Sequence, residues 1–180
     1  MSAPAPGRPG HVVLVGMMGV GKTTVGRRLA EALRRPFSDS DLEVEARTGR
    51  TVRAIFETEG EPAFRAIEAQ VMADALATPE PTVIAAAGGV VLDPANREQL
   101  RRAGTVVWLR APVVVLVDRV ASGAHRPAVE ADPAGTLQQM EDTRTALYTE
   151  VADVVVDSSL PVTEVVAEVL SAVEQREAAA

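Results

Sequence analysis

The sequence predicts an α/β protein in which a five-stranded parallel sheet lies between layers of helices. Short apolar runs alternate with longer amphipathic segments along the 180 residues, and this alternation is typical of a mostly parallel sheet with crossover helices. A composition with 47% hydrophobic residues is sufficient for one compact domain with a substantial core. We therefore expect a single domain over residues 11–176, between a disordered tail at 1–10 and a frayed end at 177–180.

Five apolar runs are expected to form the strands. The first, HVVLV at His11–Val15, has the uninterrupted apolar character of a buried strand. A short second strand follows Pro36 and carries Asp39 and Asp41 at its end. The remaining strands are expected at Thr82–Ala86, Thr105–Leu109 and Asp153–Asp157.

Helices are expected between these strands. Val25, Leu29 and Leu33 recur at helical spacing after the first strand, and Pro36 ends that helix. Further helices are predicted at about Leu42–Arg47, Val52–Glu59, Gly60–Ala77, Asp93–Gly104, Pro112–Ser122, Leu137–Tyr148 and Val162–Glu174. Residues 122–135 lack a helical period and are rich in turn-forming residues, which predicts a lid at about these positions.

Charge and residue usage exclude several classes of partner. Eighteen basic and 25 acidic residues give a net charge of −7, so no overall positive field would attract nucleic acid. The absence of cysteine excludes disulfides and thiolate metal sites, and two histidines are too few for a histidine zinc cluster. No run approaches the roughly 20 apolar residues that span a bilayer. We expect a cytoplasmic protein with neither a nucleic-acid nor a membrane partner.

The segment GMMGVGKT, Gly16–Thr23, fits the phosphate-binding pattern G-x-x-x-x-G-K-T and lies between an expected strand and an expected helix. Glycines let consecutive backbone amides point at a β-phosphate, while the threonine hydroxyl can bind Mg²⁺. Lys22 is the only lysine among 18 basic residues. Its compact ammonium can sit between phosphate oxygens where a forked guanidinium is too large, which explains lysine at this position.

This pattern predicts a bound nucleotide, with Mg²⁺ as the metal. The expected nucleotide contacts are Gly16, Gly19, Val20, Gly21, Lys22, Thr23 and Thr24. The alternative is a glycine-rich turn that binds no ligand. A GTPase would need a base-reading NKxD motif, which the sequence lacks, and Asp157 at the end of the last strand is interpreted as a loop or cap residue. A small phosphotransferase is therefore the expected class.

Five segments occur in an order that makes the chain resemble one family. They are GMMGVGKTTVGRRLA, SDSDLEVEARTGRTVRAIFETEGEPAFRAIE, AAAGGVVLDPANR, HRP and RTALY. Between Val12 and about Ala172 the chain is similar to the shikimate kinase family. The resemblance implies a three-layer P-loop kinase fold with a substrate segment at about 41–76 and a lid at about 122–135. It also implies transfer of the ATP γ-phosphate to the 3-hydroxyl of shikimate, a step toward aromatic amino acids, by a chain expected to be a monomer.

The resemblance assigns roles to the remaining site residues. Asp41 matches the aspartate that holds the substrate hydroxyls and either accepts a proton or only positions the attacking group. Asp39 matches the aspartate that assists Thr23 with Mg²⁺. The catalytic set is Lys22, Asp41 and Arg126, of which Arg126 lies in the lid and neutralises charge on the transferred phosphoryl group. Arg119 and Pro161 match positions beside the adenine.

Substrate binding is assigned in the same way to two arginines and two glycines. Arg65 and Arg144 match the arginines that grip the substrate carboxylate, a task suited to a guanidinium fork. Gly88 and Gly89 match glycines that present backbone amides to the substrate. The family usually has three glycines here, whereas position 87 is alanine, which the loop tolerates if the φ angle there is negative.

Simpler interpretations of the same residues stay open. Both aspartates could cap the following helix, and the two glycines could merely end a strand. Each arginine follows a glutamate at helical spacing, Glu61 before Arg65 and Glu141 before Arg144, so both could form ordinary surface pairs. Two other functions also remain: a related kinase whose arginines grip a phosphate, and a nucleotide-binding module that has lost phosphate transfer.

Overall fold

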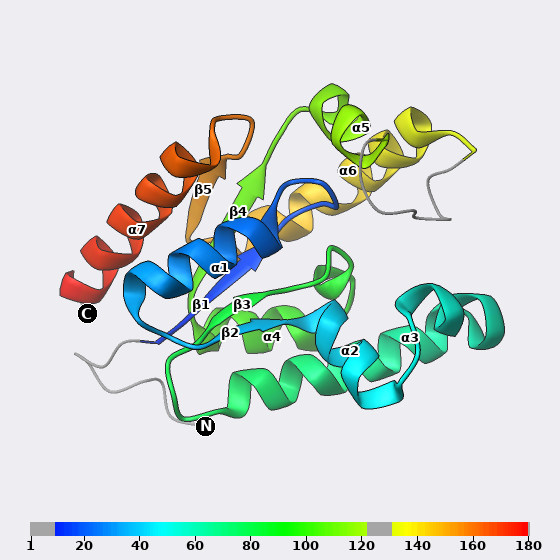
Figure 1. The fold of residues 1–180 in the computed structure, drawn as a ribbon, viewed down its shortest axis with the longest axis horizontal. Coiled ribbons are helices and arrows are strands. Elements are labelled where there is room, and N and C mark those ends of the chain that lie inside the picture. The colour runs from blue at the N-terminus through cyan, green and yellow to red at the C-terminus, as the bar shows by residue number, and fades with distance from the viewer. Residues whose placement is uncertain (1–9, 122–130, 180) are drawn as a thin grey trace.

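The computed structural model describes residues 10–121 and 131–179, and in these residues five strands form one parallel sheet (Figure 1). The strand order is β2–β3–β1–β4–β5, and every neighbouring pair is parallel. The strands are β1 (His11–Val15), β2 (Phe37–Asp39), β3 (Val83–Ala85), β4 (Gly104–Arg110) and β5 (Val154–Asp157). The predicted α/β class with a five-stranded parallel sheet is confirmed.

Helices cover both faces of this sheet. Figure 1 shows α1 and α7 on one face, α4 and α6 on the other, and α2 with the first part of α3 to one side. The helices are α1 (Lys22–Leu33), α2 (Ser40–Thr48), α3 (Val52–Ala77), α4 (Pro94–Ala103), α5 (Val113–Ala121), α6 (Pro133–Val151) and α7 (Val162–Ala179). A 3-10 turn, η1 (Val90–Leu92), precedes α4.

The main core lies around β1, the middle strand. All five residues of β1 are buried, because β3 and β4 pair with its two edges and helices cover both faces. Helix α7 contributes Val165, Val169 and Val173, which recur every four residues along its inner face. A second, smaller cluster joins α2 to α3 through Val44, Ile55, Phe64 and Val71. The α2–α3 part therefore has its own small core beside the sheet.

The structure shifts the start of α2 relative to the sequence prediction. Helix α2 begins at Ser40, directly after β2, because the Asp39 carboxylate caps it by accepting hydrogen bonds from the amides of Asp41 and Leu42. Asp41 consequently lies in the first turn of a helix and not at the end of a strand. The two helices expected at 52–59 and 60–77 are both present, because the backbone at Gly60 is non-helical, with φ 83° and ψ 173°, and divides α3 into two parts.

The boundaries of the lid and of the C-terminus also differ from the prediction. Helix α6 begins at Pro133 and is capped by Asp132, so residues 133–135 are helical where a lid was expected. Helix α7 continues to Ala179 through the predicted frayed end, because Glu177 pairs with Arg35 at 2.8 Å. The lid residues 122–130 and the tail residues 1–9 lie outside the described residues.

Shortening Val169 tests the packing of α7 on the sheet. Val169 is fully buried, so Val169→Ala should lower the free energy of unfolding by about 2 kcal/mol through lost apolar burial and the cavity left behind. Val114 offers a matched control, because it is also a helical valine but is 68% exposed. Val114→Ala should change stability by less than about 0.5 kcal/mol in the same urea titration. Equal effects of the two substitutions would contradict the docking of α7.

Candidate active site

The loop between β1 and α1 has a backbone that only glycine allows at three positions. Gly16, Gly19 and Gly21 have φ angles of 140°, 82° and 92°. A Cβ atom on Gly16 would also lie 2.3 Å from the carbonyl oxygen of Leu109 in β4. The predicted phosphate loop is therefore closely packed against the neighbouring strand and leads directly into the N-terminus of α1.

The ammonium group of Lys22 lies within this loop. Its Nζ donates hydrogen bonds to the carbonyl oxygens of Gly16 at 2.7 Å and Met17 at 3.0 Å. Thr24 is exposed in the first turn of α1, while the Val20 side chain is buried, so Val20 can offer a ligand only its backbone. The loop thus combines a positive charge with a helix N-terminus, the arrangement that binds phosphate.

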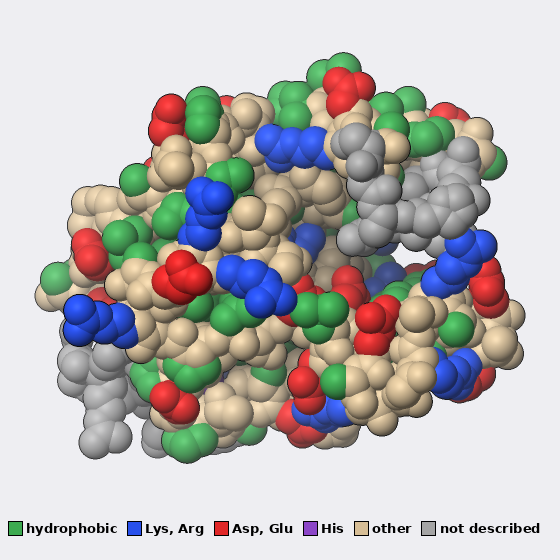
Figure 2. All heavy atoms as spheres, in the orientation of Figure 1, with side chains coloured by type: hydrophobic (Ala, Val, Ile, Leu, Met, Phe, Trp, Pro, Cys, Tyr) green, Lys and Arg blue, Asp and Glu red, His purple; other side chains and the backbone are tan. Residues whose placement is uncertain are grey.

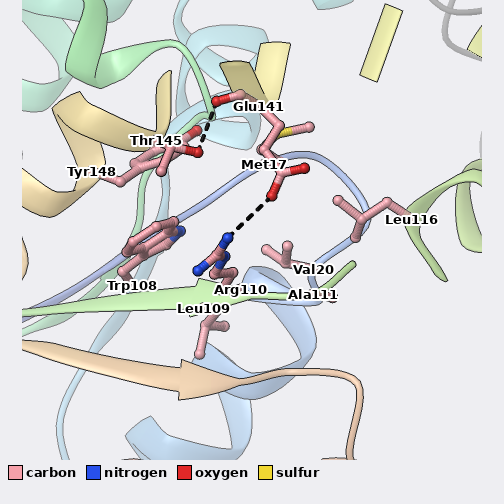
Figure 3. Close-up of a pocket in the computed structure, with 10 residues that line it drawn as sticks. All are labelled: Met17, Val20, Trp108, Leu109, Arg110, Ala111, Leu116, Glu141, Thr145 and Tyr148. Carbon is pink, nitrogen blue, oxygen red and sulfur yellow. Dashed lines mark hydrogen bonds and ion pairs between the residues drawn. The ribbon is translucent and has the colours of Figure 1, made fainter. Parts of the chain in front are cut away.

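A small apolar cavity lies beneath the same loop (Figure 3). Figure 3 shows Met17, Val20 and Leu116 around it, with Trp108 and Tyr148 on the other side. Its volume of about 10 Å³ accommodates roughly one water molecule. We interpret this cavity as part of the support of the loop and not as a substrate site.

Thr23 and Asp39 bring two hard oxygen ligands together beside the loop. The Thr23 hydroxyl donates to Asp39 Oδ2 at 2.6 Å, while Asp39 Oδ1 caps α2. The capping alternative is therefore correct for Asp39, but it uses only one of the two carboxylate oxygens. Within the described residues no group of three or more His, Cys, Asp or Glu side chains could hold a metal alone. The pair fits Mg²⁺, which keeps waters and binds phosphates together with few protein ligands.

Arg65 is held by two carboxylates of its own helix. Its Nη1 donates to both oxygens of Glu68 at 3.0 and 2.9 Å, and its Nε and Nη2 donate to Glu61 Oε1 at 3.2 and 3.0 Å. The alternative of a pair with Glu61 is thus observed, together with a second partner. Burial alone would lower the pKa of Arg65, but the Glu68 and Glu61 carboxylates outweigh that effect and raise it.

Glu68 is a buried acid: its side chain is only 2% exposed. Burial raises the pKa of its carboxyl group, the charge of Arg65 lowers it, and the nearby Asp41 raises it further. The charge of Arg144 also lowers the pKa of Glu68, so this second arginine lies close to Glu68. Arg65, Glu68, Asp41 and Arg144 therefore form one electrostatic group.

Arg144 is buried on the inner side of α6. It is 9% exposed, and it forms no salt bridge with any residue in the described ranges 10–121 and 131–179. The alternative partner, Glu141, instead lies 3.6 Å from Arg110. One turn further along α6, the Tyr148 hydroxyl donates to the carbonyl oxygen of Gly88 at 2.6 Å. Sequence reasoning missed this contact, although the i, i+4 spacing in RTALY places Arg144 and Tyr148 on one helix face.

Gly88 and Gly89 lie in crowded surroundings. A Cβ atom on Gly88 would lie 3.2 Å from the carbonyl oxygen of Gly16 and 3.5 Å from Arg144 Nη1. A Cβ atom on Gly89 would lie only 2.2 Å from Arg65 Nη1. The β3 loop is thus in contact with the phosphate loop and with both arginines, so these segments meet at the C-terminal edge of the sheet, where parallel sheets bind ligands.

Ala87 fits this loop without strain. Arg34 is the only non-glycine residue with positive φ in the described part of the chain, so the φ angle of Ala87 is not positive. The amide of Ala87 donates to Ser40 Oγ at 2.8 Å, a contact that sequence reasoning did not predict. The departure from three glycines therefore leaves the backbone of the loop intact.

The nucleotide side of the site is described in part. Arg119 donates to the carbonyl oxygens of Gly19 at 3.2 Å and Ser158 at 2.8 Å, so its guanidinium spans the phosphate loop and the segment after β5. Pro161 lies three residues after Ser158, directly before α7, and is exposed. Their contact with adenine stays a prediction. Arg126 lies outside the described residues, so its role stays a prediction.

A hollow of about 390 Å³ opens beside Arg65 and Glu68. Figure 2 shows this face of the molecule hollowed between the body of the molecule and the α2–α3 part, with acidic and basic side chains on the walls. The lining residues are Glu61, Pro62, Arg65, Glu68, Gly89, Leu92, Asp93 and Asn96. The site is therefore open to a small polar ligand from this side.

Known proteins are similar to this chain in sequence and in fold. The family pattern described as shikimate kinase matches residues 18–174, nearly the whole chain. The chain belongs to the shikimate kinase family. The shikimate kinase of Dechloromonas aromatica is 46% identical over 150 residues, covering 83% of this chain and 81% of that protein. The shikimate kinase of Pseudomonas syringae pv. tomato is 44% identical over 163 residues, covering 89% and 94%.

Solved structures of the shikimate kinase family have the same fold. Shikimate kinase from Acinetobacter baumannii in complex with shikimate matches with a TM-score of 0.89 at 36% identity, over 94% of this chain and 96% of that chain. A gluconokinase from Sinorhizobium meliloti matches less closely, with a TM-score of 0.68 at 26% identity over 94% of each chain. The predicted kinase class and family are confirmed. In the described part of the chain, no helix is both long and apolar enough to cross a membrane.

The buried hydroxyl of Tyr148 makes a prediction for alkaline solution. Burial raises the pKa of Tyr148 to about 12, because the phenolate would be desolvated there. The folded state thus favours the neutral phenol, and this stabilisation is complete below the ordinary pKa near 10 and is lost between about pH 10 and pH 12. Tyr148 is the only tyrosine, so the near-ultraviolet absorbance of phenolate reports it alone. A midpoint near 10 in the folded protein would contradict this environment.

Proposed function

We propose that the C-terminal edge of the sheet carries out the reaction of this family, transfer of the ATP γ-phosphate to the 3-hydroxyl of shikimate. In this proposal ATP binds at the loop from Gly16 to Thr24, and shikimate binds beside it. The products are shikimate 3-phosphate and ADP, a step of aromatic amino acid biosynthesis. The predicted monomeric state and cytoplasmic location stay predictions.

One observation carries the assignment of the substrate site: the buried Arg144 has no carboxylate partner among the described residues. The nearby Glu68, whose pKa Arg144 lowers, is already paired with Arg65, so a buried guanidinium that has no salt bridge of its own is well suited to an anionic ligand. Arg144 lies beside Gly88, and Gly88 lies against Gly16 of the phosphate loop. An acid held by Arg144 would therefore be a neighbour of the phosphate that is transferred.

The other residues have complementary tasks in this proposal. Arg65 and Arg144 hold the substrate carboxylate, the amides of Gly88 and Gly89 face the ring, and Asp41 accepts hydrogen bonds from its hydroxyls. Because phosphoryl transfer has a loose transition state, Asp41 contributes more by positioning the 3-hydroxyl than by removing its proton. Lys22 neutralises charge on the phosphates, and the predicted role of Arg126 is the same.

Mg²⁺ fits the Thr23–Asp39 pair. The two side chains supply a hydroxyl and a carboxylate oxygen at 2.6 Å from each other, and the phosphates and water would complete the shell. When bound, Mg²⁺ would neutralise phosphate charge and orient the terminal phosphoryl group. Thr23 and Asp39 would orient the metal at the phosphate loop.

Steady-state assays of three variants test the substrate site. We expect Arg65→Ala and Arg144→Ala each to raise the KM for shikimate by about 10- to 100-fold, because a charge-assisted hydrogen bond contributes about 1.5–3 kcal/mol. The KM for ATP should stay within about twofold. Lys22→Met should reduce kcat by at least about 100-fold, because it removes charge from the phosphates.

One control removes an arginine far from the site, and a second set of assays compares shikimate with other acceptors. Arg176 forms a half-exposed pair with Asp153 away from the site, so Arg176→Ala should leave both KM values unchanged. Gluconate and nucleoside monophosphates serve as alternative acceptors in a coupled ADP-release assay. Faster turnover of a nucleoside monophosphate than of shikimate, or an unchanged shikimate KM in both arginine variants, would rule out the proposed site.

The metal assignment has its own test. Thr23→Ser keeps the hydroxyl, whereas Thr23→Val removes it and leaves Asp39 Oδ2 without its donor. Thr23→Val should raise the Mg²⁺ concentration for half-maximal activity by about 10-fold or more, and Thr23→Ser by less than about threefold. The measurement is a Mg²⁺ titration at fixed ATP after removal of metal with EDTA. An equal Mg²⁺ requirement in both variants would argue against a role for Thr23.

A further inference from the structure

The guanidinium of Arg65 has most of its donors already in use. A guanidinium carries five N–H groups. Nη1 donates to both oxygens of Glu68, and Nε and Nη2 each donate to Oε1 of Glu61. A bidentate grip on a ligand carboxylate needs two parallel N–H groups on one edge of the fork. In this arrangement Glu61 fills the Nε–Nη2 edge of Arg65, and Glu68 engages Nη1, which belongs to the other edge.

The two glutamates differ in how strongly they hold Arg65. Glu68 is 2% exposed and binds with both oxygens, so removing its partner would leave a buried charge. Glu61 is 57% exposed and uses one oxygen, and such a surface pair contributes only about 0–1 kcal/mol. Glu61 also occupies the Nε–Nη2 edge, which is one of the two edges that an incoming carboxylate can use. Glu61 is therefore the partner that a ligand can displace.

We propose that Glu61 is an internal competitor of the substrate carboxylate: it occupies the binding edge of Arg65 in the unliganded protein and leaves when an acid binds. This inference rests on the proposed function, in which Arg65 grips shikimate. A ligand with a carboxylate can exchange for Glu61 at equal charge. A neutral ligand offers weaker hydrogen bonds and leaves Glu61 in place, so Glu61 lowers the affinity of the site for acids and not for neutral ligands.

The surroundings allow Glu61 to leave. It lines the hollow of about 390 Å³ together with Pro62 and Asn96, so its side chain has room to move away from Arg65. It also directly follows the kink at Gly60, where the second part of α3 begins with unpaired amides. A carboxylate at a helix N-terminus is stabilised by about 0.3–1 kcal/mol, which helps to hold the displaced side chain in the hollow.

Two substitutions at position 61 test the competition. Glu61→Gln removes the charge but keeps the shape, and we expect the KM for shikimate to fall by about 3- to 10-fold with kcat and the ATP KM unchanged. Glu61→Asp keeps the charge but shortens the reach to Arg65, and it should lower the KM in the same direction. If only the local field of Glu61 mattered, Glu61→Asp would leave the KM unchanged, and the proposal would be wrong.

Two controls accompany these variants: a neutral ligand, and the Glu98–Arg102 pair on α4. The inhibition constant of shikimate methyl ester should stay within about twofold in Glu61→Gln, because this ligand does not exchange for a carboxylate. A fall equal to that of the shikimate KM would overturn the proposal. Glu98 precedes Arg102 on α4 with the same spacing and order, so Glu98→Gln changes the net charge equally and should change neither constant.

The Arg65→Ala variant distinguishes failure of this inference from failure of the proposed function. If Arg65→Ala raises the shikimate KM while both Glu61 variants leave it unchanged or raise it, the substrate site stands and the competition is refuted. If Arg65→Ala leaves the KM unchanged, both are refuted. The result that supports the competition is a raised KM in Arg65→Ala, a lowered KM in both Glu61 variants and an unchanged constant for the ester.

Discussion

The close contact between the loop after β1 and the loop after β3 is the constraint on which the site depends. β1 lies in the middle of the sheet with β3 beside it, so their C-terminal loops are neighbours. Gly16 and Gly88 permit the contact, because a Cβ atom on Gly88 would lie 3.2 Å from the carbonyl oxygen of Gly16. This approach brings a loop that binds phosphate within reach of groups that hold an acceptor. The topology thus supplies the proximity that phosphoryl transfer requires.

The site brings three cations together beside several carboxylates, in a protein whose net charge is −7. Lys22, Arg65 and Arg144 each bring a cation to the same edge of the sheet, but their surroundings differ. Backbone carbonyls hold Lys22, two carboxylates hold Arg65, and Arg144 is buried with its neighbour Tyr148. Because Tyr148 stays neutral far above physiological pH, it fixes the Gly88 carbonyl without adding charge. The group can therefore attract one anion while the Gly88 carbonyl beside it stays fixed.

Sequence patterns predicted the parts of the site that are local in the chain. The phosphate loop is one continuous segment, whereas the pairing of Thr23 with Asp39 was expected only from the family resemblance. Contacts between distant segments had no such signal. Tyr148 meets Gly88 across 60 positions, and Arg35 holds Glu177 across 142, which keeps α7 helical where composition alone indicated a frayed end. Asp41 was placed on a strand because the capping by Asp39, which starts α2 early, depends on a side-chain conformation and not on a pattern.

Alanine at position 87 shows which glycines of the β3 loop the site needs. A Cβ atom on Gly88 would crowd the carbonyl oxygen of Gly16, and one on Gly89 would displace the guanidinium of Arg65. Ala87 precedes this crowded stretch, its φ is not positive, and its amide is fixed by Ser40 Oγ at 2.8 Å. Ser40 directly follows Asp39, the residue that starts α2 and accepts a hydrogen bond from Thr23. The Ala87–Ser40 contact therefore ties the loop that faces the substrate to the residues proposed to hold the metal, and the alanine preserves that link.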